Sequence, residues 1–140
     1  MGIFSHVILF GAILVGGAAA ALALYGRYRS LPALFTGPQI CRLEAGGCQV
    51  LFRTKSAALL GIPNSALGIL YYAALTVSLL LQGSLPHWSA WLLLAVATSA
   101  LLMTLWLARI LLRDKLECRV CWTGHICNLL IWLLLLLDVR

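Results

Sequence analysis

The sequence predicts an all-α membrane protein, a single domain over residues 1–140 that folds as a four-transmembrane-helix bundle with a cysteine-bearing loop between the first and second helices. Of its 140 residues, 63% are hydrophobic and only 10% are charged. A soluble domain of this size would need more polar surface to cover its core. Four apolar runs are long enough to cross a hydrocarbon layer of about 30 Å. These predicted spans lie near residues 3–25, 62–82, 88–108 and 119–137.

The first span is expected to be retained rather than removed as a signal peptide. Met1 to His6 carries no Lys or Arg, and the apolar run exceeds the core of a typical signal peptide. Small residues follow one another in this span, at Gly16, Gly17 and residues 18–21. Such residues let helices approach closely in lipid.

The second span opens with Gly61-Ile62-Pro63-Asn64-Ser65. Pro63 is compatible with a first helical turn. Asn64 shares a helix face with Gly68 and Tyr71, because they are four and seven residues away. Asn64 therefore has two interpretations, as a cap of this helix or as part of a pocket at the membrane edge.

The basic residues are distributed very unevenly. The loop that joins the second and third spans contains no Lys or Arg, and only Arg140 lies beyond the fourth. The other nine basic residues therefore share one membrane side, where they would face headgroups rather than nucleic acid. Cytoplasmic loops hold the excess of Lys and Arg, so this side is predicted to be cytoplasmic. The nine are Arg27, Arg29, Arg42, Arg53, Lys55, Arg109, Arg113, Lys115 and Arg119.

Four of the five cysteines form two pairs on this same side. Cys41 and Cys48 lie in the long first loop with six residues between them, and glycines come directly before the second cysteine. Cys118 and Cys121 form a CxxC motif at the start of the fourth span. A helix N-terminus favours negative charge and so lowers the pKa of a thiol. CxxC spacing also lets two sulfurs form and break a disulfide.

Polar residues follow the CxxC motif into the fourth span. At about 100° per residue, Cys121, His125 and Asn128 share a face with Cys118, whereas Cys127 points about the opposite way and is interpreted as a packing thiol. Polar side chains inside a span are costly and usually face a functional interior. His125 and Asn128 therefore indicate a pocket, and the alternative is that they join helices by hydrogen bonds.

The order of these motifs resembles the vitamin K epoxide reductase family over about residues 30 to 128. The matching elements are Cys41-x6-Cys48, Thr54-Lys55-Ser56-Ala57, Gly61-Ile62-Pro63-Asn64-Ser65-x2-Gly68, and Cys118-x2-Cys121-Trp122-Thr123 with Asn128 downstream.

The resemblance implies a role for each cysteine of the two pairs. Cys121 would face a membrane quinone, and Cys118 would be its disulfide partner. Cys48 would exchange with Cys118, and Cys41 would pass the disulfide to a separate thioredoxin-like protein.

The resemblance also implies a quinone site. Asn64 matches the position whose amide hydrogen-bonds a quinone oxygen. Thr54 stands where Ser is usual, and His125 stands where a quinone-facing Tyr is usual, so the quinone type (menaquinone, ubiquinone or similar) stays open. Together with Tyr71 and Asn128, these residues form the predicted quinone site.

The sequence thus predicts a quinone-dependent thiol-disulfide oxidoreductase that generates disulfides. One alternative is a soft-metal-binding or metal-transporting protein that uses Cys118, Cys121 and His125. Another is a membrane scaffold braced by structural disulfides. The other quinone-linked disulfide-generating family of bacterial inner membranes carries its CxxC in the first loop, and the order here is reversed.

The distribution of basic residues and the family resemblance predict opposite orientations of the protein in the membrane. Members of the resembled family mostly place their cysteines outside the cytoplasm, whereas the basic residues place these inside. We predict an inverted topology with a cytoplasmic cysteine face, as in organisms that form disulfides in the cytosol. The alternative is an extracytoplasmic cysteine face.

Overall fold

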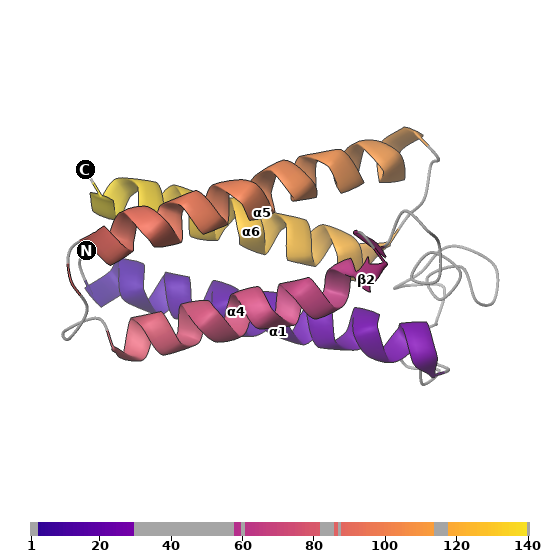
Figure 1. Ribbon diagram of the computed structural model, residues 1–140, viewed down its shortest axis with the longest axis horizontal. Coiled ribbons are helices and arrows are strands. Elements are labelled where there is room, and N and C mark those ends of the chain that lie inside the picture. The colour runs from indigo at the N-terminus through magenta and orange to yellow at the C-terminus, as the bar shows by residue number, and fades with distance from the viewer. Residues whose placement is uncertain are drawn as a thin grey trace.

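The computed structural model of the protein describes residues 3–29, 58–59, 61–81, 86, 88–113 and 118–139. Cys41, Cys48 and Thr54 lie outside these residues. Within them are four helices and one short antiparallel pair of strands (Figure 1). The elements are α1 (Ile3–Tyr28), β1 (Ala58–Leu59), β2 (Ile62–Pro63), α4 (Asn64–Leu80), α5 (Trp88–Arg113) and α6 (Arg119–Val139).

The predicted all-α membrane bundle is confirmed. Helices α1, α5 and α6 are each long and apolar enough to cross a membrane. Helix α4 is a shorter apolar helix of 17 residues, about 26 Å at 1.5 Å per residue, which is close to the thickness of the hydrocarbon layer. The outer faces remain apolar, with Leu70, Leu102 and Leu137 each more than 60% exposed. These side chains would face lipid.

The start of the second span differs from the sequence-based expectation. Ile62 and Pro63 form strand β2, which pairs with β1 across a turn at Gly61, so Pro63 does not lie in a first helical turn. Gly61 has a φ of +86°, a conformation that side chains with a Cβ rarely adopt. Pro63 is the N-cap of α4, and no side chain caps this helix end. Asn64 is therefore the first helical residue and does not act as the cap.

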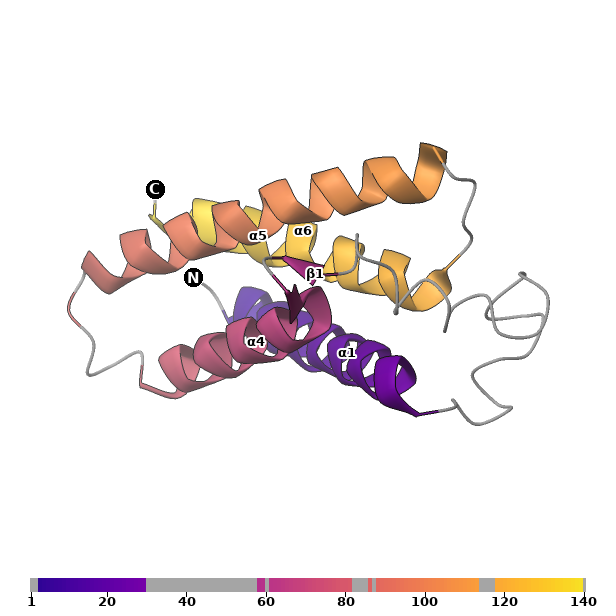
Figure 2. The ribbon, with the colours of Figure 1, turned by 45° about the vertical axis from the view of Figure 1, so that its right-hand side comes forward.

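The helices lie side by side along the long axis of the molecule (Figures 1 and 2). The end of α1, the start of α4, the end of α5 and the start of α6 lie at one end of the bundle, and both chain termini lie at the other. Helix α1 packs against α4 and α6, and α6 packs against α5. Within the described residues α4 and α5 make only marginal contact with each other.

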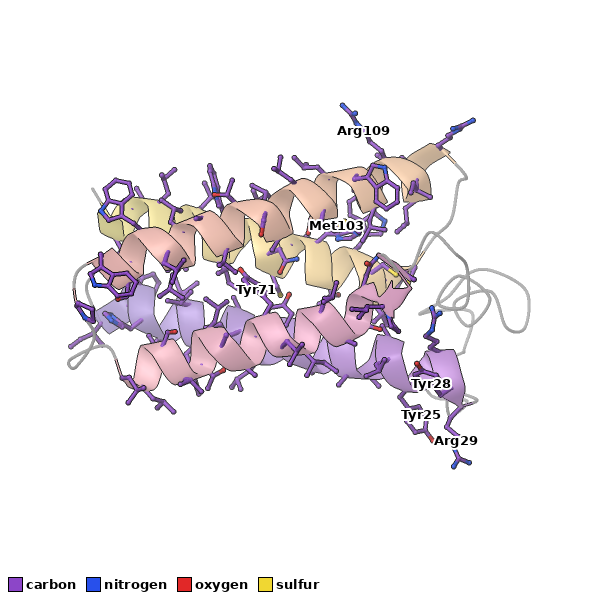
Figure 3. The ribbon with its side chains drawn as sticks, in the orientation of Figure 1. Tyr25, Tyr28, Arg29, Tyr71, Met103 and Arg109 are labelled. Carbon is purple, nitrogen blue, oxygen red and sulfur yellow. The ribbon has the colours of Figure 1, made fainter. Side chains whose placement is uncertain are left out.

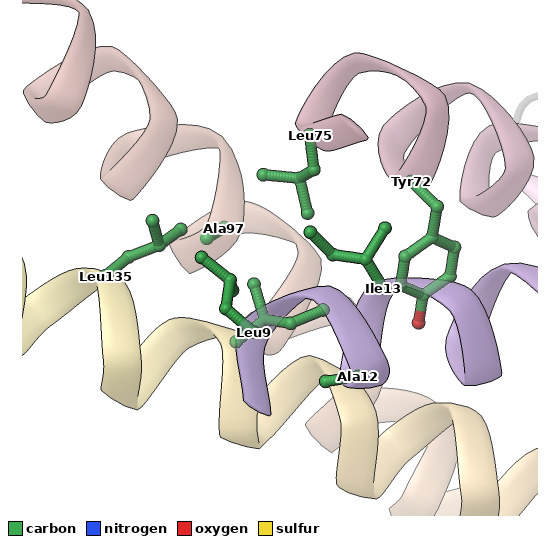
Figure 4. Packing of buried hydrophobic residues seen from close by; sticks show 8 residues of the cluster. Leu9, Ala12, Ile13, Tyr72, Leu75, Ala97 and Leu135 are labelled. Carbon is green, nitrogen blue, oxygen red and sulfur yellow. The ribbon is translucent and has the colours of Figure 1, made fainter. Parts of the chain in front are cut away.

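The core lies where α1, α4 and α6 meet, with a contribution from α5 (Figure 4). Gly16 and Ala19 are buried on α1, as expected for small residues that bring helices close together. A cavity lies between α4 and α5, towards the end of the bundle that carries the CxxC motif. The core residues are Leu9, Ala12, Ile13, Tyr72, Leu75, Ala97, Ile131 and Leu135.

Candidate functional site

Cys118 lies immediately before α6 and caps this helix. It is fully buried, at 0% exposure. Its carbonyl oxygen accepts a hydrogen bond from the Trp122 N–H at 3.0 Å, and its Sγ accepts one from the Cys121 N–H at 3.3 Å. The thiol thus takes the place that a Ser or Asp side chain usually has at a helix N-cap. The spacing of the motif follows from this geometry, because the residue three positions after a cap offers its N–H to the capping side chain.

The same contacts make the Cys118 thiol more acidic than that of an ordinary cysteine. A hydrogen bond from the Cys121 side chain lowers the pKa of Cys118, and the N–H groups of Cys121 and Val120 lower it further against the opposing effect of burial. Hydrogen bonds to a charged group favour its charged form. Both cysteines are free thiols in this structure. Negative charge in the reduced pair is therefore favoured on Cys118, with Cys121 as its hydrogen-bond donor.

A cavity of about 660 Å³ opens next to this pair, lined by residues of α1, α4, α5 and α6. It brings together five of the residues predicted from the sequence, namely Cys121, Asn64, Tyr71, His125 and Asn128. Cys118 is not among its lining residues, so only one sulfur of the motif faces the cavity. Cys127, which is buried, also lies outside the lining.

The walls of the cavity are mostly apolar, and two of them come from α4 and α5, which make only marginal contact with each other among the described residues. Leu67 and Gly68 of α4 lie on one side, and Met103 and Leu107 of α5 lie on the other. Figure 3 shows Tyr71 on α4 and Met103 on α5 in this region of the bundle. Cavities with apolar walls and a few polar groups are typical of small-molecule sites.

At the cavity, His125 Nε2 and Tyr71 Oη have no hydrogen-bond partner among the described residues. A buried polar atom without a partner costs about 1–3 kcal/mol. The His125 ring also meets the Trp122 ring edge to face, with centroids 5.9 Å apart and an interplanar angle of 88°. These orphaned atoms in an apolar cavity fit a flat ligand that carries oxygen acceptors, which is the chemistry of a quinone.

Asn128 also lines the cavity, and its side-chain amide is hydrogen-bonded to two other residues. Its Oδ1 accepts from Tyr72 Oη at 2.7 Å, and its Nδ2 donates to Thr104 Oγ1 at 2.8 Å. The amide thus joins α4, α5 and α6, as the helix-joining interpretation of this residue expects. Sequence reasoning missed Tyr72 and Thr104. The available signal was one polar residue near the middle of each of three predicted spans. The sequence does not show which of these side chains contact one another.

The metal-binding alternative finds no assembled site in the described part of the chain. There, no group of three or more His, Cys, Asp or Glu side chains comes together. Cys118 and Cys121 are adjacent, but His125 lies one turn further along α6, facing the cavity.

The comparisons with known proteins bear on the same region. The family model described as "Vitamin K epoxide reductase family" matches residues 7–136, which include almost all of the four helices and the CxxC motif. No curated protein and no solved structure matches the chain. With nearly its whole length matched by this family model, the chain belongs to the vitamin K epoxide reductase family of membrane thiol oxidoreductases.

Proposed function

We propose that this protein oxidises a thioredoxin-like partner and passes the electrons through Cys41/Cys48 and Cys118/Cys121 to a membrane quinone. One observation carries the proposal. The cavity between α4 and α5 holds a single sulfur of the CxxC motif, Cys121, beside Asn64 and the orphaned Nε2 of His125. A hydrophobic oxidant in this cavity would meet one thiol, together with an amide and an imidazole that can hydrogen-bond to it. It would meet little water.

The inner pair, as one thiol and one thiolate, supplies both electrons and one of the two protons that a quinone needs to become quinol. The Cys121 thiol gives its proton to the Cys118 thiolate, to which it is hydrogen-bonded. The resulting Cys121 thiolate faces the quinone, and two electrons leave the pair as the Cys118–Cys121 disulfide forms. The quinone takes these two electrons, the one proton of the pair and a second proton from water at the membrane edge, and leaves as quinol. His125 and Asn64 hold its oxygen, so that the charge that develops there is stabilised by hydrogen bonds.

Thiol-disulfide exchange then regenerates the inner pair. The Cys48 thiolate attacks Sγ of Cys118, and Cys121 leaves as the thiolate. Cys41 attacks Sγ of Cys48 and releases Cys118, which leaves a Cys41–Cys48 disulfide. A reduced thioredoxin-like protein takes over this disulfide and returns two thiols to the loop. Cys118 is buried and lies immediately before α6, at the membrane edge, so this is where Cys48 would have to reach it.

The test is anaerobic mixing of the reduced, purified protein with short-chain quinones while quinol absorbance is followed. Cys121→Ala should abolish quinol formation. Cys41→Ala should retain it when a small dithiol replaces the partner, because the inner pair is intact. Cys127→Ala is the matched control, since Cys127 lies on the same helix outside the cavity lining. Full activity in Cys121→Ala would refute the proposal.

We further propose that the cysteine end of the bundle faces the cytoplasm. The structure supports this by placing Arg29 and Arg109 at the end of the bundle where α6 begins (Figure 3). The ends of α1 and α5 and the start of α6 thus bring their arginines together at one membrane surface. Anionic headgroups of the cytoplasmic leaflet attract such a cluster.

A further inference from the structure

One residue from each of the four helices meets in a layer across the middle of the bundle. This layer, the Asn128 layer, consists of Gly16 of α1, Tyr72 of α4, Thr104 of α5 and Asn128 of α6. All four residues line the cavity. The Tyr72 hydroxyl donates to Asn128, and the Asn128 amide donates to Thr104. The layer is therefore connected from α4 to α5 through α6.

The three hydrogen-bonded residues lie at matching depths. Tyr72 is eight residues from the start of α4, Asn128 is nine from the start of α6, and Thr104 is nine from the end of α5. These three helix ends lie at the same end of the bundle (Figure 1). At 1.5 Å per residue, each residue is about 12 to 14 Å below that end, near the middle of a hydrocarbon layer of about 30 Å.

At this depth, the hydrogen bonds of the Asn128 layer connect α4 and α5, which are not held together by packing within the described part of the chain. Helix α4 packs on α1, and α5 packs on α6, but the two make only marginal contact with each other among the described residues. The Asn128 side chain bonds to a residue on each of them. Water is scarce at mid-membrane, so a hydroxyl or amide that lost its partner there would be costly to leave unpaired.

Gly16 fixes the position of the Tyr72 side chain from the other side. A Cβ at Gly16 would overlap the Tyr72 ring and its hydroxyl oxygen. A Cβ at Gly17 would make only ordinary contact, 3.6 Å from Tyr72 Cβ. The tyrosine ring therefore lies directly on the backbone of α1 at Gly16, and its hydroxyl reaches Asn128 from there.

We infer that the Asn128 layer sets the separation of α4 and α5, and that this separation determines which quinone rings the cavity accepts. The inference rests on the proposed function. Tyr72, Thr104 and Asn128 are then positioning residues, which act on the quinone through the spacing of the two helices that form its walls. Asn128, whose amide is engaged by two helices, holds the site open rather than serving as a ligand. Loosening the layer should weaken discrimination between one-ring benzoquinones and two-ring naphthoquinones.

Substitutions that remove one hydroxyl each provide the test. Thr104→Val and Tyr72→Phe each delete one bond of the layer and nearly preserve shape. Each should raise the quinone KM about fivefold, as expected for one lost hydrogen bond, and should narrow the difference in KM between benzoquinone and naphthoquinone. The rate at saturating quinone should stay within about twofold, because the layer does not touch the sulfurs. Thr104→Ser, which keeps the hydroxyl, should restore both KM values.

Thr98→Val is the matched control. Thr98 also lies on α5 and also accepts a hydrogen bond from α6, from Trp132 Nε1 at 3.0 Å, but it does not line the cavity. Its loss should leave the KM values of both quinone classes unchanged. If Thr98→Val changed them as much as Thr104→Val, or if neither Thr104→Val nor Tyr72→Phe changed them, the inference would be overturned.

A distance measurement separates this inference from the proposed function. Spin labels introduced as unnatural amino acids at the lipid-exposed Leu70 of α4 and Leu105 of α5 report the helix separation without any turnover. Thr104→Val and Tyr72→Phe should broaden the distance distribution, and Thr98→Val should not. An unchanged distribution would refute the spacing role even in an active enzyme. If these two variants broadened the distribution but the wild-type protein reduced no quinone, the proposed function alone would be refuted.

Discussion

At the scale of single residues, the CxxC motif assigns different properties to its two thiols. Cys118 caps α6 and accepts hydrogen bonds, whereas Cys121 donates to it and faces the cavity. The thiolate is the reactive form of cysteine. The negative charge is thus held on Cys118 and the proton on Cys121. Under the proposed function, these are the sulfurs that would meet the outer pair and the quinone, respectively.

The lowered pKa of Cys118 predicts an unusual pH dependence of its alkylation. Its thiolate should persist to lower pH than that of an ordinary cysteine, whose pKa is about 8.5, so the rate should fall only as the pH drops below that range. Cys121→Ala removes the largest cause of the lowering and should move the inflection to higher pH. Mass spectrometry after timed reaction with the small neutral alkylating reagent iodoacetamide measures this rate. An inflection unmoved by Cys121→Ala would contradict the proton sharing, and Cys127→Ala serves as the control.

His125 is expected to govern quinone affinity. His125→Phe removes a polar atom that has no partner among the described residues, so a bound quinone would lose a hydrogen bond. We expect the quinone KM to rise about tenfold, and His125→Gln to recover part of the loss because its amide can still donate. Steady-state quinol formation measures both. Ile126→Ala, at a position 62% exposed on the same helix, should be neutral. An unchanged KM in His125→Phe would exclude this contact.

At the scale of the elements, the close approach of α1 and α4 depends on Gly16. Gly16→Ala would force its methyl group into the Tyr72 ring, and overpacking of this kind costs about 1–3 kcal/mol. We expect a lower unfolding temperature in detergent, measured by circular dichroism. Gly17→Ala and Gly11→Ala should be tolerated, because a Cβ meets only ordinary contact at the first and nothing within 4 Å at the second. Equal effects from all three would show that the contact does not matter.

The helices show where pattern-based prediction succeeds and where it fails. Each predicted span overlaps a helix, because long apolar runs leave the chain no other way to satisfy its backbone groups in lipid. The ends were less predictable. Helices α1 and α5 continue to Tyr28 and Arg113, where arginine side chains can reach the headgroups. The β1–β2 pair, which displaces the start of α4 to Asn64, depends on a turn at Gly61 that hydropathy does not reveal.

At the scale of the whole molecule, the bundle has two unlike ends. The end with Cys118 carries the arginines of the described residues, which lie near the ends of α1 and α5 and at the start of α6. The opposite end carries both termini and the exposed Trp88 and Trp91. Aromatic residues of this kind favour the membrane interface. This polarity places the thiol chemistry at one surface and leaves the cavity within the bilayer between α4 and α5.

The proposed orientation can be tested by labelling intact cells with a membrane-impermeant maleimide. A cysteine-free variant with only Cys48 restored should stay unlabelled until the cells are permeabilised. The same variant with only Ile3→Cys, at the opposite end of the bundle, should be labelled directly, since Ile3 is 88% exposed. The reverse pattern would establish the extracytoplasmic alternative for the cysteine face.

The sequence by itself determined the membrane bundle, the approximate positions of its helices, the segregation of charge along the chain and the face of α6 that carries Cys121 and His125. These features depend on the periodicity and composition of each segment. An apolar segment in lipid has to form a helix to satisfy its own backbone hydrogen bonds, wherever the other segments lie. Only the tertiary structure decided that α4 and α5 stand apart, that the cavity lies between them, and that Tyr72, Asn128 and Thr104 join across it. Such contacts depend on how helices distant in the chain align in depth and rotation. That alignment is fixed by packing, as at Gly16 against Tyr72, and no single segment encodes it.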